Sequence, residues 1–421
     1  MKNCFLLLFS LQFCLYSCNE MKNDEVFQRV DDMGVVIATP FLWKTSLHEK
    51  EPVSNGFVFP PVYYMGNVLI STTNGDKNVN KFTLIDTDIG KTIWSWDDQF
   101  EPKFSDLYIR FYHQYNNILT FQWGSWSYGI NLDNGTSKWR EKRDRSFDVR
   151  IGSFDKYFFS YAEVINSDGY NEFIAFKGDM QTGVLSEFLK ANLAFEHPDC
   201  VRGIYHVTQV PNQKNLLVVT YCENLPDWVT QPYFGLYDTE TYEWIWDKIL
   251  ILPPKPSNGL YYEPIIVNNK IYGAISTSIV CHDLETGKQL WKREFNGNFE
   301  SAGIILEEGK VIANCEDTYA YALEAETGNI LWSVKTAGTC SRMSYLNGVV
   351  YMVGGSGGGR LFAIEASTGK MLWRIDAGLL GEGEGARFRT NAVYVLPAKD
   401  DQPAKVIALS DMYAYCFEAE R

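Results

Sequence analysis

Short runs of apolar and β-branched residues follow one another along most of this chain, and turn-forming residues separate them. The clearest stretch predicts strands over 342–346, 349–353, 360–365 and 371–375, with an Asn347-Gly348 turn between the first two. Asn-Gly between two such runs is a strong hairpin signal. Strands this short, with turn signals about every 8 to 12 residues, predict an all-β fold.

One phrase recurs at a fixed spacing. It reads Asp-Leu-Glu-Thr-Gly-Lys-Gln-Leu-Trp at 283–291, and in its three clearest copies the tryptophans are 41 residues apart. The copy at 179–187 has lost its tryptophan and ends at Glu187. A period in the 40s with four strands per repeat is typical of β-propeller blades, in which a tryptophan lies as an apolar plate between neighbouring blades. The tryptophans that end the other copies are Trp94, Trp139, Trp246, Trp291, Trp332 and Trp373.

The two ends of the chain complement each other. A last partial copy, at 411–420, stops before its tryptophan strand, whereas the strand around Trp43 has no blade before it. We predict that this N-terminal strand completes the C-terminal blade, because that pairing removes an open sheet edge. The predicted fold is an eight-bladed β-propeller of four-stranded antiparallel blades over 36–421.

Residues 1–17 precede the repeats and are predicted to be a signal peptide. The apolar stretch from Phe5 to Tyr16 is too short to span a bilayer and is typical of a secretory signal. Ser17 before Cys18 resembles a bacterial lipoprotein signal, so Cys18 is the predicted lipidated residue; ordinary secretion with an incidental cysteine is the alternative. Residues 18–35 would form a polar tether. We therefore expect a bacterial envelope protein held by lipid alone, on the outer membrane and either periplasmic or surface-exposed.

Charge and cysteine usage narrow the function classes. The net charge of −14 without a basic run argues against nucleic acid as a partner. No Cys-x-x-Cys pair exists and the five histidines are scattered, so a zinc site is unsupported. Alignment of the repeats places Cys200 and Cys222 on adjoining strand ends of the fourth blade, where an exported protein permits a disulfide. Buried free cysteines are the equal alternative.

The same alignment places arginines on the innermost strands, which line the central channel of a propeller. Converging arginines in an acidic protein would favour an anionic ligand or an acidic partner loop. The alternative, which we favour, is a channel stapled by ion pairs with carboxylates such as Glu263. The candidate channel residues are Arg150, Arg202, Arg342 and Arg389.

The repeated phrase resembles the tryptophan-docking repeat of the pyrroloquinoline quinone (PQQ)-like eight-bladed propellers. The resemblance covers nearly all of 36–421 and implies the fold more strongly than an activity. One branch of that superfamily, the quinoprotein dehydrogenases, binds PQQ and calcium in the channel, and many members carry adjacent cysteines that this chain lacks. Another branch consists of non-enzymatic envelope lipoproteins, including the propeller subunit of the outer-membrane β-barrel assembly machinery, and this chain is similar to that plan.

These observations favour a lipid-anchored binding or scaffold module without a cofactor and without covalent chemistry. The expected partner is an envelope protein such as an outer-membrane β-barrel or one of its assembly factors. A PQQ-dependent oxidoreductase and a glycan-binding surface lipoprotein are the alternatives.

Overall fold

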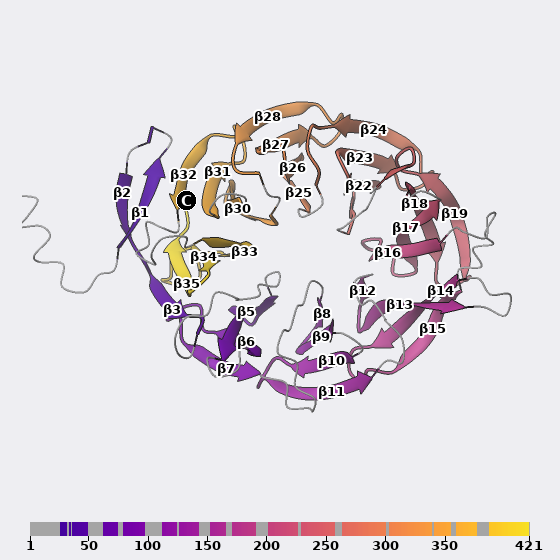
Figure 1. Ribbon diagram of the computed structural model, residues 1–421, viewed down its shortest axis with the longest axis horizontal. Helices are drawn as coiled ribbons and strands as arrows, with labels where there is room; N and C mark the ends of the chain where they lie inside the picture. The colour runs from indigo at the N-terminus through magenta and orange to yellow at the C-terminus, as the bar shows by residue number, and fades with distance from the viewer. Residues whose placement is uncertain are drawn as a thin grey trace, which may run out of the picture.

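The computed structural model describes residues 26–31, 33–34, 36–48, 62–74, 79–96, 112–123, 126–142, 152–165, 171–190, 201–225, 229–256, 263–299, 303–338, 341–354, 359–376 and 387–420. Within these ranges the chain forms strands and no helix, and the strands group into eight sheets arranged as a ring (Figure 1). The all-β, eight-bladed propeller predicted from the repeats is confirmed. No helix in this described part is long and apolar enough to cross a membrane.

The first four blades run in chain order, each from its innermost to its outermost strand. Blade one contains β4 (Val62–Tyr64), β5 (Asn67–Asn74), β6 (Val79–Ile85) and β7 (Thr92–Trp96). Blade two contains β8 (Tyr112–Tyr115), β9 (Ile118–Trp123), β10 (Trp126–Asn131) and β11 (Thr136–Lys142). Blade three contains β12 (Ser153–Phe154), β13 (Tyr157–Ile165), β14 (Asn171–Asp179) and β15 (Leu185–Lys190). Blade four contains β16 (Val201–Gln209), β17 (Leu216–Leu225), β18 (Val229–Asp238) and β19 (Glu243–Leu250), and the short β20 (Lys255–Pro256) also pairs with β18.

The next three blades repeat this order. Blade five contains β21 (Ile265–Val267), β22 (Lys270–Ile275), β23 (Ser278–Asp283) and β24 (Gln289–Glu294). Blade six contains β25 (Ile304–Glu307), β26 (Lys310–Asn314), β27 (Tyr319–Glu324) and β28 (Ile330–Lys335). Blade seven contains β29 (Met343–Leu346), β30 (Val349–Gly354), β31 (Arg360–Glu365) and β32 (Met371–Asp376), close to the bounds predicted from the sequence.

Blade eight joins the two ends of the chain. Its inner strands are β33 (Phe388–Leu396), β34 (Lys405–Ser410) and β35 (Tyr413–Glu418), and its outermost strand is β3 (Trp43–Ser46). Trp43 pairs with Cys416 and Ser46 pairs with Tyr413. The predicted closure by the N-terminal strand is therefore confirmed.

The segment before β3 also forms strands. β1 (Val26–Asp31) and β2 (Val36–Pro40) make an antiparallel hairpin, and β1 pairs with β32 at the outer edge of blade seven. Blade seven thus has six strands, and the hairpin lies outside the ring (Figure 1). Residues 26–31 belong to the stretch expected to be a tether, and here they cover a sheet edge that would otherwise be open.

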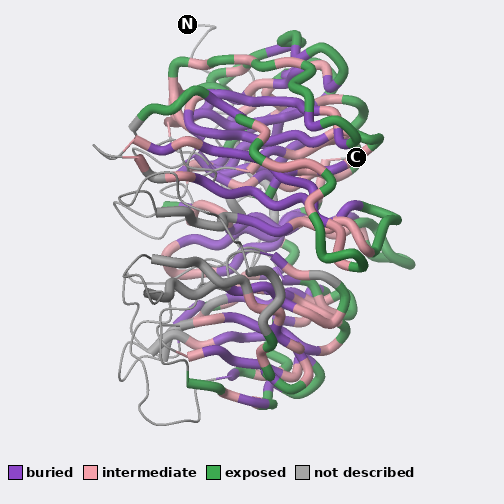
Figure 2. Tube along the Cα trace, turned by 90° about the vertical axis from the view of Figure 1, so that its right-hand side faces the viewer, coloured by how far each residue is buried: buried purple, intermediate pink, exposed green. Residues whose placement is uncertain are grey.

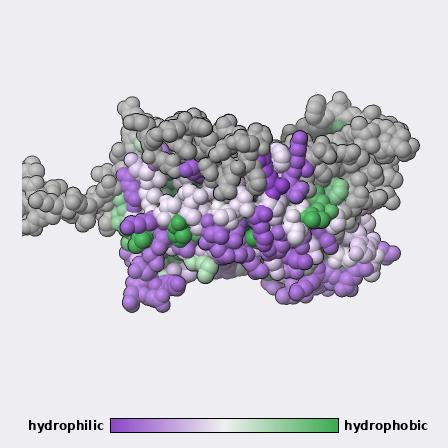
Figure 3. All heavy atoms as spheres, turned by 90° about the horizontal axis from the view of Figure 1, so that it is seen from below, coloured by the Kyte–Doolittle hydropathy of each residue, from purple (hydrophilic) through white to green (hydrophobic). Residues whose placement is uncertain are grey.

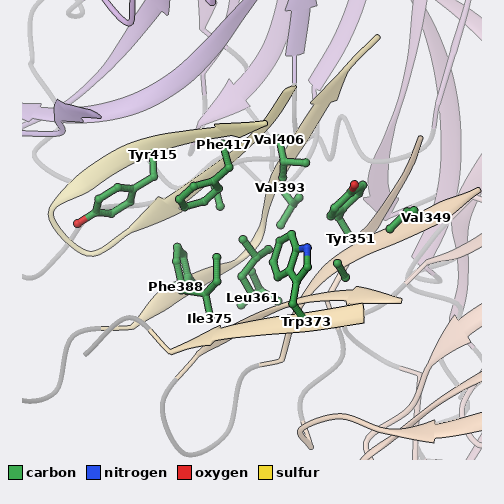
Figure 4. Packing of buried hydrophobic residues seen from close by; sticks show 13 residues of the cluster. Val349, Tyr351, Leu361, Trp373, Ile375, Phe388, Val393, Val406, Tyr415 and Phe417 are labelled. Carbon is green, nitrogen blue, oxygen red and sulfur yellow. The ribbon is translucent and has the colours of Figure 1, made fainter. Parts of the chain in front are cut away.

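Buried strands run through the interior of the blades, and exposed residues lie mainly at the turns of the described part (Figure 2). Each buried cluster is built across a joint between blades, as shown for blades seven and eight by Trp373, Tyr351, Val393 and Phe417 (Figure 4). Because a strand has two faces, each blade can bury one face against each neighbour. The apolar core therefore continues around the ring.

Candidate functional site

Seven tryptophans hold neighbouring blades together by one repeated contact, which we call the indole latch. In each case the indole Nε1–H donates a hydrogen bond to an acceptor in the next blade. At six latches the acceptor is a backbone carbonyl, and Trp373 donates instead to Glu420 Oε1 at 2.9 Å. The six backbone pairs are Trp43 with Thr87 (2.8 Å), Trp94 with Leu132 (3.0 Å), Trp139 with Met180 (2.8 Å), Trp246 with Leu284 (3.1 Å), Trp291 with Ala325 (3.0 Å) and Trp332 with Ala366 (2.9 Å).

The turn glycine of the next blade makes room for each of these six indoles. A Cβ atom built on Gly328 would lie 2.6 Å from Cε3 of Trp291, and Gly328 also has a φ of +69°. Two requirements therefore coincide at one position, because glycine both adopts this backbone conformation without steric cost and lets the ring approach. The tryptophan and the glycine of the repeat belong to a single contact between two blades.

The structure describes the whole residue, side chain included, for two of the four predicted channel arginines, Arg342 and Arg389. Arg389, in β33, forms an ion pair with Asp411 at 2.5 Å. Arg342 precedes β29, and its backbone N–H donates to Oδ1 of Asn391 at 2.7 Å. Arg202 lies in β16 opposite Glu223, and Arg150 lies outside the described residues. Anionic-ligand binding by these arginines thus stays a prediction, and Arg389 has a carboxylate partner within its own blade.

A group of ionisable side chains from different blades meets at the central axis. Glu263 of blade five lies close to Gly152, at the start of blade three, because a Cβ on Gly152 would be 3.5 Å from its Oε1. Glu263 is exposed, and partial desolvation by the protein around it raises its pKa. The positive charge of Arg342 opposes the rise. Burial likewise raises the pKa of Tyr112 in blade two, again against the charge of Arg342.

Two further tyrosines belong to this axial group, and no motif in the sequence marks them. Tyr63 lies in β4, and its hydroxyl accepts a hydrogen bond from the Val395 N–H at 2.9 Å. Tyr394 is fully buried in β33 and donates to the Leu69 carbonyl at 3.3 Å. Each lies on an innermost strand, so repeat alignment was the one signal that could have found them. Both contacts join blade eight to blade one, which favours a structural role.

Acidic and other metal-ligating side chains are sparse among the described axial residues. Calcium takes six to eight oxygen ligands, several of them from carboxylates. Among the described residues, no three His, Cys, Asp or Glu side chains group as metal ligands. The described axial group supplies one carboxyl group, that of Glu263.

The cysteines of the described strands are buried. Desolvation raises the pKa of Cys281, Cys315 and Cys416 to about 12, so the reactive thiolate form is disfavoured. Cys222 is buried in β17 opposite Gly203. Cys200 lies outside the described residues, so its pairing with Cys222 stays a prediction. Cys18 lies outside them as well.

Exposed aliphatic side chains recur on the outermost strands of three consecutive blades, four to six. On these strands, the residues next to a latch tryptophan face solvent: Ile245 is 52% exposed, Leu290 45% and Leu331 50%. A single exposed aliphatic side chain is ordinary. The residue before the latch tryptophan is also exposed in blade one (Ile93, 48%) and in blade eight (Leu42, 41%), and in blades four to six it recurs in three neighbouring blades. Elsewhere on the rim, in the view of Figure 3, separate apolar patches interrupt a mostly hydrophilic surface. We call the residues of blades four to six the outer aliphatic strip, which comprises Ile245, Leu250, Leu290, Ile330 and Leu331.

Fold and repeat together define an eight-bladed β-propeller whose blades are joined by tryptophans. Residues 237–373 match the family model described as outer membrane protein assembly factor BamB. Comparison with curated protein sequences found no match.

Solved structures share the fold at low identity. BamB from Moraxella catarrhalis is 11% identical with a TM-score of 0.55, covering 90% of this chain and 98% of that one. Quinohemoprotein alcohol dehydrogenase from Comamonas testosteroni is 12% identical with a TM-score of 0.58, covering 90% and 77%. The computationally designed Ika8 protein is 12% identical with a TM-score of 0.58, covering 89% and 99%.

Proposed function

We propose that this protein is a lipid-anchored scaffold of the bacterial cell envelope that binds a protein partner, in outer-membrane protein assembly. The observation that carries the proposal is the outer aliphatic strip on blades four to six. A closed, latched ring keeps these side chains in a fixed arrangement, so a partner that covers them loses little conformational entropy of the scaffold on binding. The family-model match over 237–373 spans the same blades.

The test is site-specific photo-crosslinking in cells of the full-length protein. A photoreactive amino acid replaces Leu290 or Leu331 in the strip, and Lys214, in an exposed turn of blade four, serves as the control position. We expect the strip positions, and not position 214, to crosslink to an outer-membrane β-barrel or an assembly factor. Leu290→Lys and Leu331→Lys should each abolish the crosslink made from the other position. Equal crosslinking from all three positions would contradict the proposal.

The lipid anchor is proposed from the sequence and has its own test. Cys18 is the predicted site of acylation, so the wild-type protein should incorporate radiolabelled palmitate and sediment with membranes. Cys18→Ala should lose the label and move to the soluble fraction, whereas Cys416→Ala, which alters a buried cysteine, should do neither. A membrane-bound, unlabelled wild-type protein would contradict lipidation while leaving the scaffold proposal open to the crosslinking test.

The alternative function is that of a quinoprotein. Its one support is the fold shared with quinohemoprotein alcohol dehydrogenase. It predicts that the purified protein, given PQQ and calcium, acquires the absorbance of bound quinone. Glu263→Gln should weaken such binding, because it removes the axial carboxyl group. An unchanged free-PQQ spectrum would eliminate this alternative.

A further inference from the structure

The joint between blades three and four departs from the other seven joints. At the place of the latch tryptophan, four residues after Gly183, the chain has Glu187. In the turn of the next blade, Tyr242 stands where six of the seven latches have a glycine. This joint therefore lacks both halves of the repeated contact.

The strand register at this joint differs as well. In blade five, Trp291 pairs with Cys281, two residues before Asp283, and a bulge follows. In blade three, Glu187 pairs with Phe176, three residues before Asp179. The backbone pairing at the latch position is therefore shifted by one residue relative to blade five.

The two substitutions are complementary. Tyr242 keeps the left-handed backbone of the glycine it replaces, with a φ of 60°, and its side chain is 67% exposed. At the six latched joints with a turn glycine, a Cβ atom on that glycine would lie 2.4–3.2 Å from an indole carbon, closer than ordinary contact, as at Gly328 (2.6 Å). The Cβ of Tyr242 thus occupies the space in which a preceding indole would lie. Blade four therefore has no space for a latch indole, and blade three has no tryptophan at the latch position.

The inner side of the same joint is tightly packed. Gly152, just before β12, has a φ of +126°, and a Cβ there would lie 1.9 Å from the Val207 carbonyl oxygen in β16. The backbone of blade three therefore lies directly against blade four near the axis. Phe159 of β13 extends this contact, since it packs in a buried cluster with Val207 and Val219.

We propose that the ring opens at this joint, with the contact between Gly152 and Val207 as the pivot and the outer strands moving apart. Local opening occurs where the fewest interactions must be broken. The other seven joints each carry an indole latch on their outer side, whereas this joint has no tryptophan at the latch position. Its contacts among the described residues include those of Gly152 and Phe159 and an approach of β14 to β16. Opening here would change the spacing between the turns of blades three and four while the rest of the ring moves as one body.

Native-state thiol labelling of the full-length protein tests the hinge. Val219→Cys places a thiol in the buried cluster at this joint, and Val311→Cys places one in the equivalent cluster between blades five and six. Both valines are buried on the second strand of a blade, so the two changes are matched. We expect the thiol at 219 to react with a maleimide about tenfold faster than the thiol at 311, or more. Mass spectrometry resolves the labelled positions. The factor corresponds to the loss of about one hydrogen bond and its packing.

A second variant tests whether the missing latch is the cause. Trp291→Glu in the Val311→Cys background removes the latch between blades five and six, and we expect the thiol at 311 to become about as reactive as that at 219. If Trp291→Glu prevents folding, the comparison of the two single cysteines still decides. Equal labelling of 219 and 311 in otherwise wild-type protein would overturn the proposal, as would a rate at 311 that does not respond to Trp291→Glu.

Discussion

At the scale of single residues, the ring depends on the fit between an indole and the glycine of the next blade. The turn requires a left-handed backbone conformation, which asparagine also adopts in this chain, as at Asn347 with a φ of 50°. The close approach of the indole leaves no room for a Cβ atom, and glycine is the residue that has none. The second requirement explains why the repeat has glycine and not asparagine in this turn.

A pair of glycines in blade six separates the two requirements. Gly328 and Gly309 have φ values of +69° and +72°, but a Cβ meets the Trp291 ring only at Gly328 and open space at Gly309. Gly309→Ala should cost about 1–2 kcal/mol, the price of the left-handed backbone for a residue with a Cβ. Gly328→Ala should cost about 1–3 kcal/mol more because of overpacking. Urea unfolding of both variants measures the difference, and equal losses would show that the indole contact is not tight.

Glu420 gives the latch of blade seven a side-chain acceptor. Trp373 is 3% exposed, so its indole N–H depends on the hydrogen bond to Glu420 Oε1. Glu420→Ala should lower the free energy of unfolding by about 1–3 kcal/mol, because a buried donor loses its partner. Glu420→Gln keeps an oxygen acceptor and should retain most of the stability. Glu418→Ala, at the exposed end of the same blade, is the control, and a loss there as large as at 420 would refute a specific role.

At the scale of elements, the turns before the outer strands are held by carboxylates. The Asp283 Oδ1 atom accepts hydrogen bonds from the Thr286 hydroxyl at 2.6 Å and from the Thr286 N–H at 2.8 Å. Both hydrogen bonds lower the pKa of Asp283, and the bond from the hydroxyl has the larger effect. The same turn in blade four has Asp238 accepting from the Glu240 N–H at 2.8 Å, which also lowers the pKa of Asp238.

The lowered pKa values predict a loss of stability in acid. An unfolded aspartate binds its proton near pH 4, and folded Asp283 binds it at a lower pH. The stabilisation is thus complete above about pH 4 and disappears as the pH falls through the folded pKa. Asp283→Asn should flatten the fall of unfolding free energy below about pH 4, measured by urea unfolding across pH. Glu285→Gln removes a charge from the same turn and should leave the slope unchanged; an equal effect of both would point to net charge instead.

The sequence predicts the elements of the late blades well and those of the first strands poorly. The strands of blade seven were predicted within a residue or two because Asn347-Gly348 and the Ser-Thr-Gly turn fix their ends locally. The hairpin β1–β2 has no counterpart in the repeat, and its strand β1 pairs with β32, more than 300 residues away. No local pattern encodes such a pairing. The axial tyrosines were missed for the same reason, since each depends on residues of another blade.

At the scale of the whole molecule, closure is a contact between the two ends of the sequence. Trp43 in β3 donates to Thr87 of blade one while its strand pairs with β35. The buried ammonium group of Lys405 in β34 adds a hydrogen bond to the same Thr87 carbonyl at 3.2 Å. Blade eight is therefore complete only when β3 is in place, and the joint between blades eight and one depends on both ends of the chain.

The closure makes Trp43 more important than its place near the start of the sequence suggests. It is 8% exposed, and its side chain packs among Val68, Ile85 and Cys416, so its removal affects blades eight and one together. Trp43→Ala should lower the free energy of unfolding by about 3–5 kcal/mol, measured by urea or thermal unfolding. Leu42→Ala, beside it and 41% exposed, is the control and should change stability by about 0.5 kcal/mol or less. An unchanged melting temperature for Trp43→Ala would mean that the ring is held without its N-terminal strand, and the joint between blades eight and one, not that between three and four, would then be the natural place for it to open.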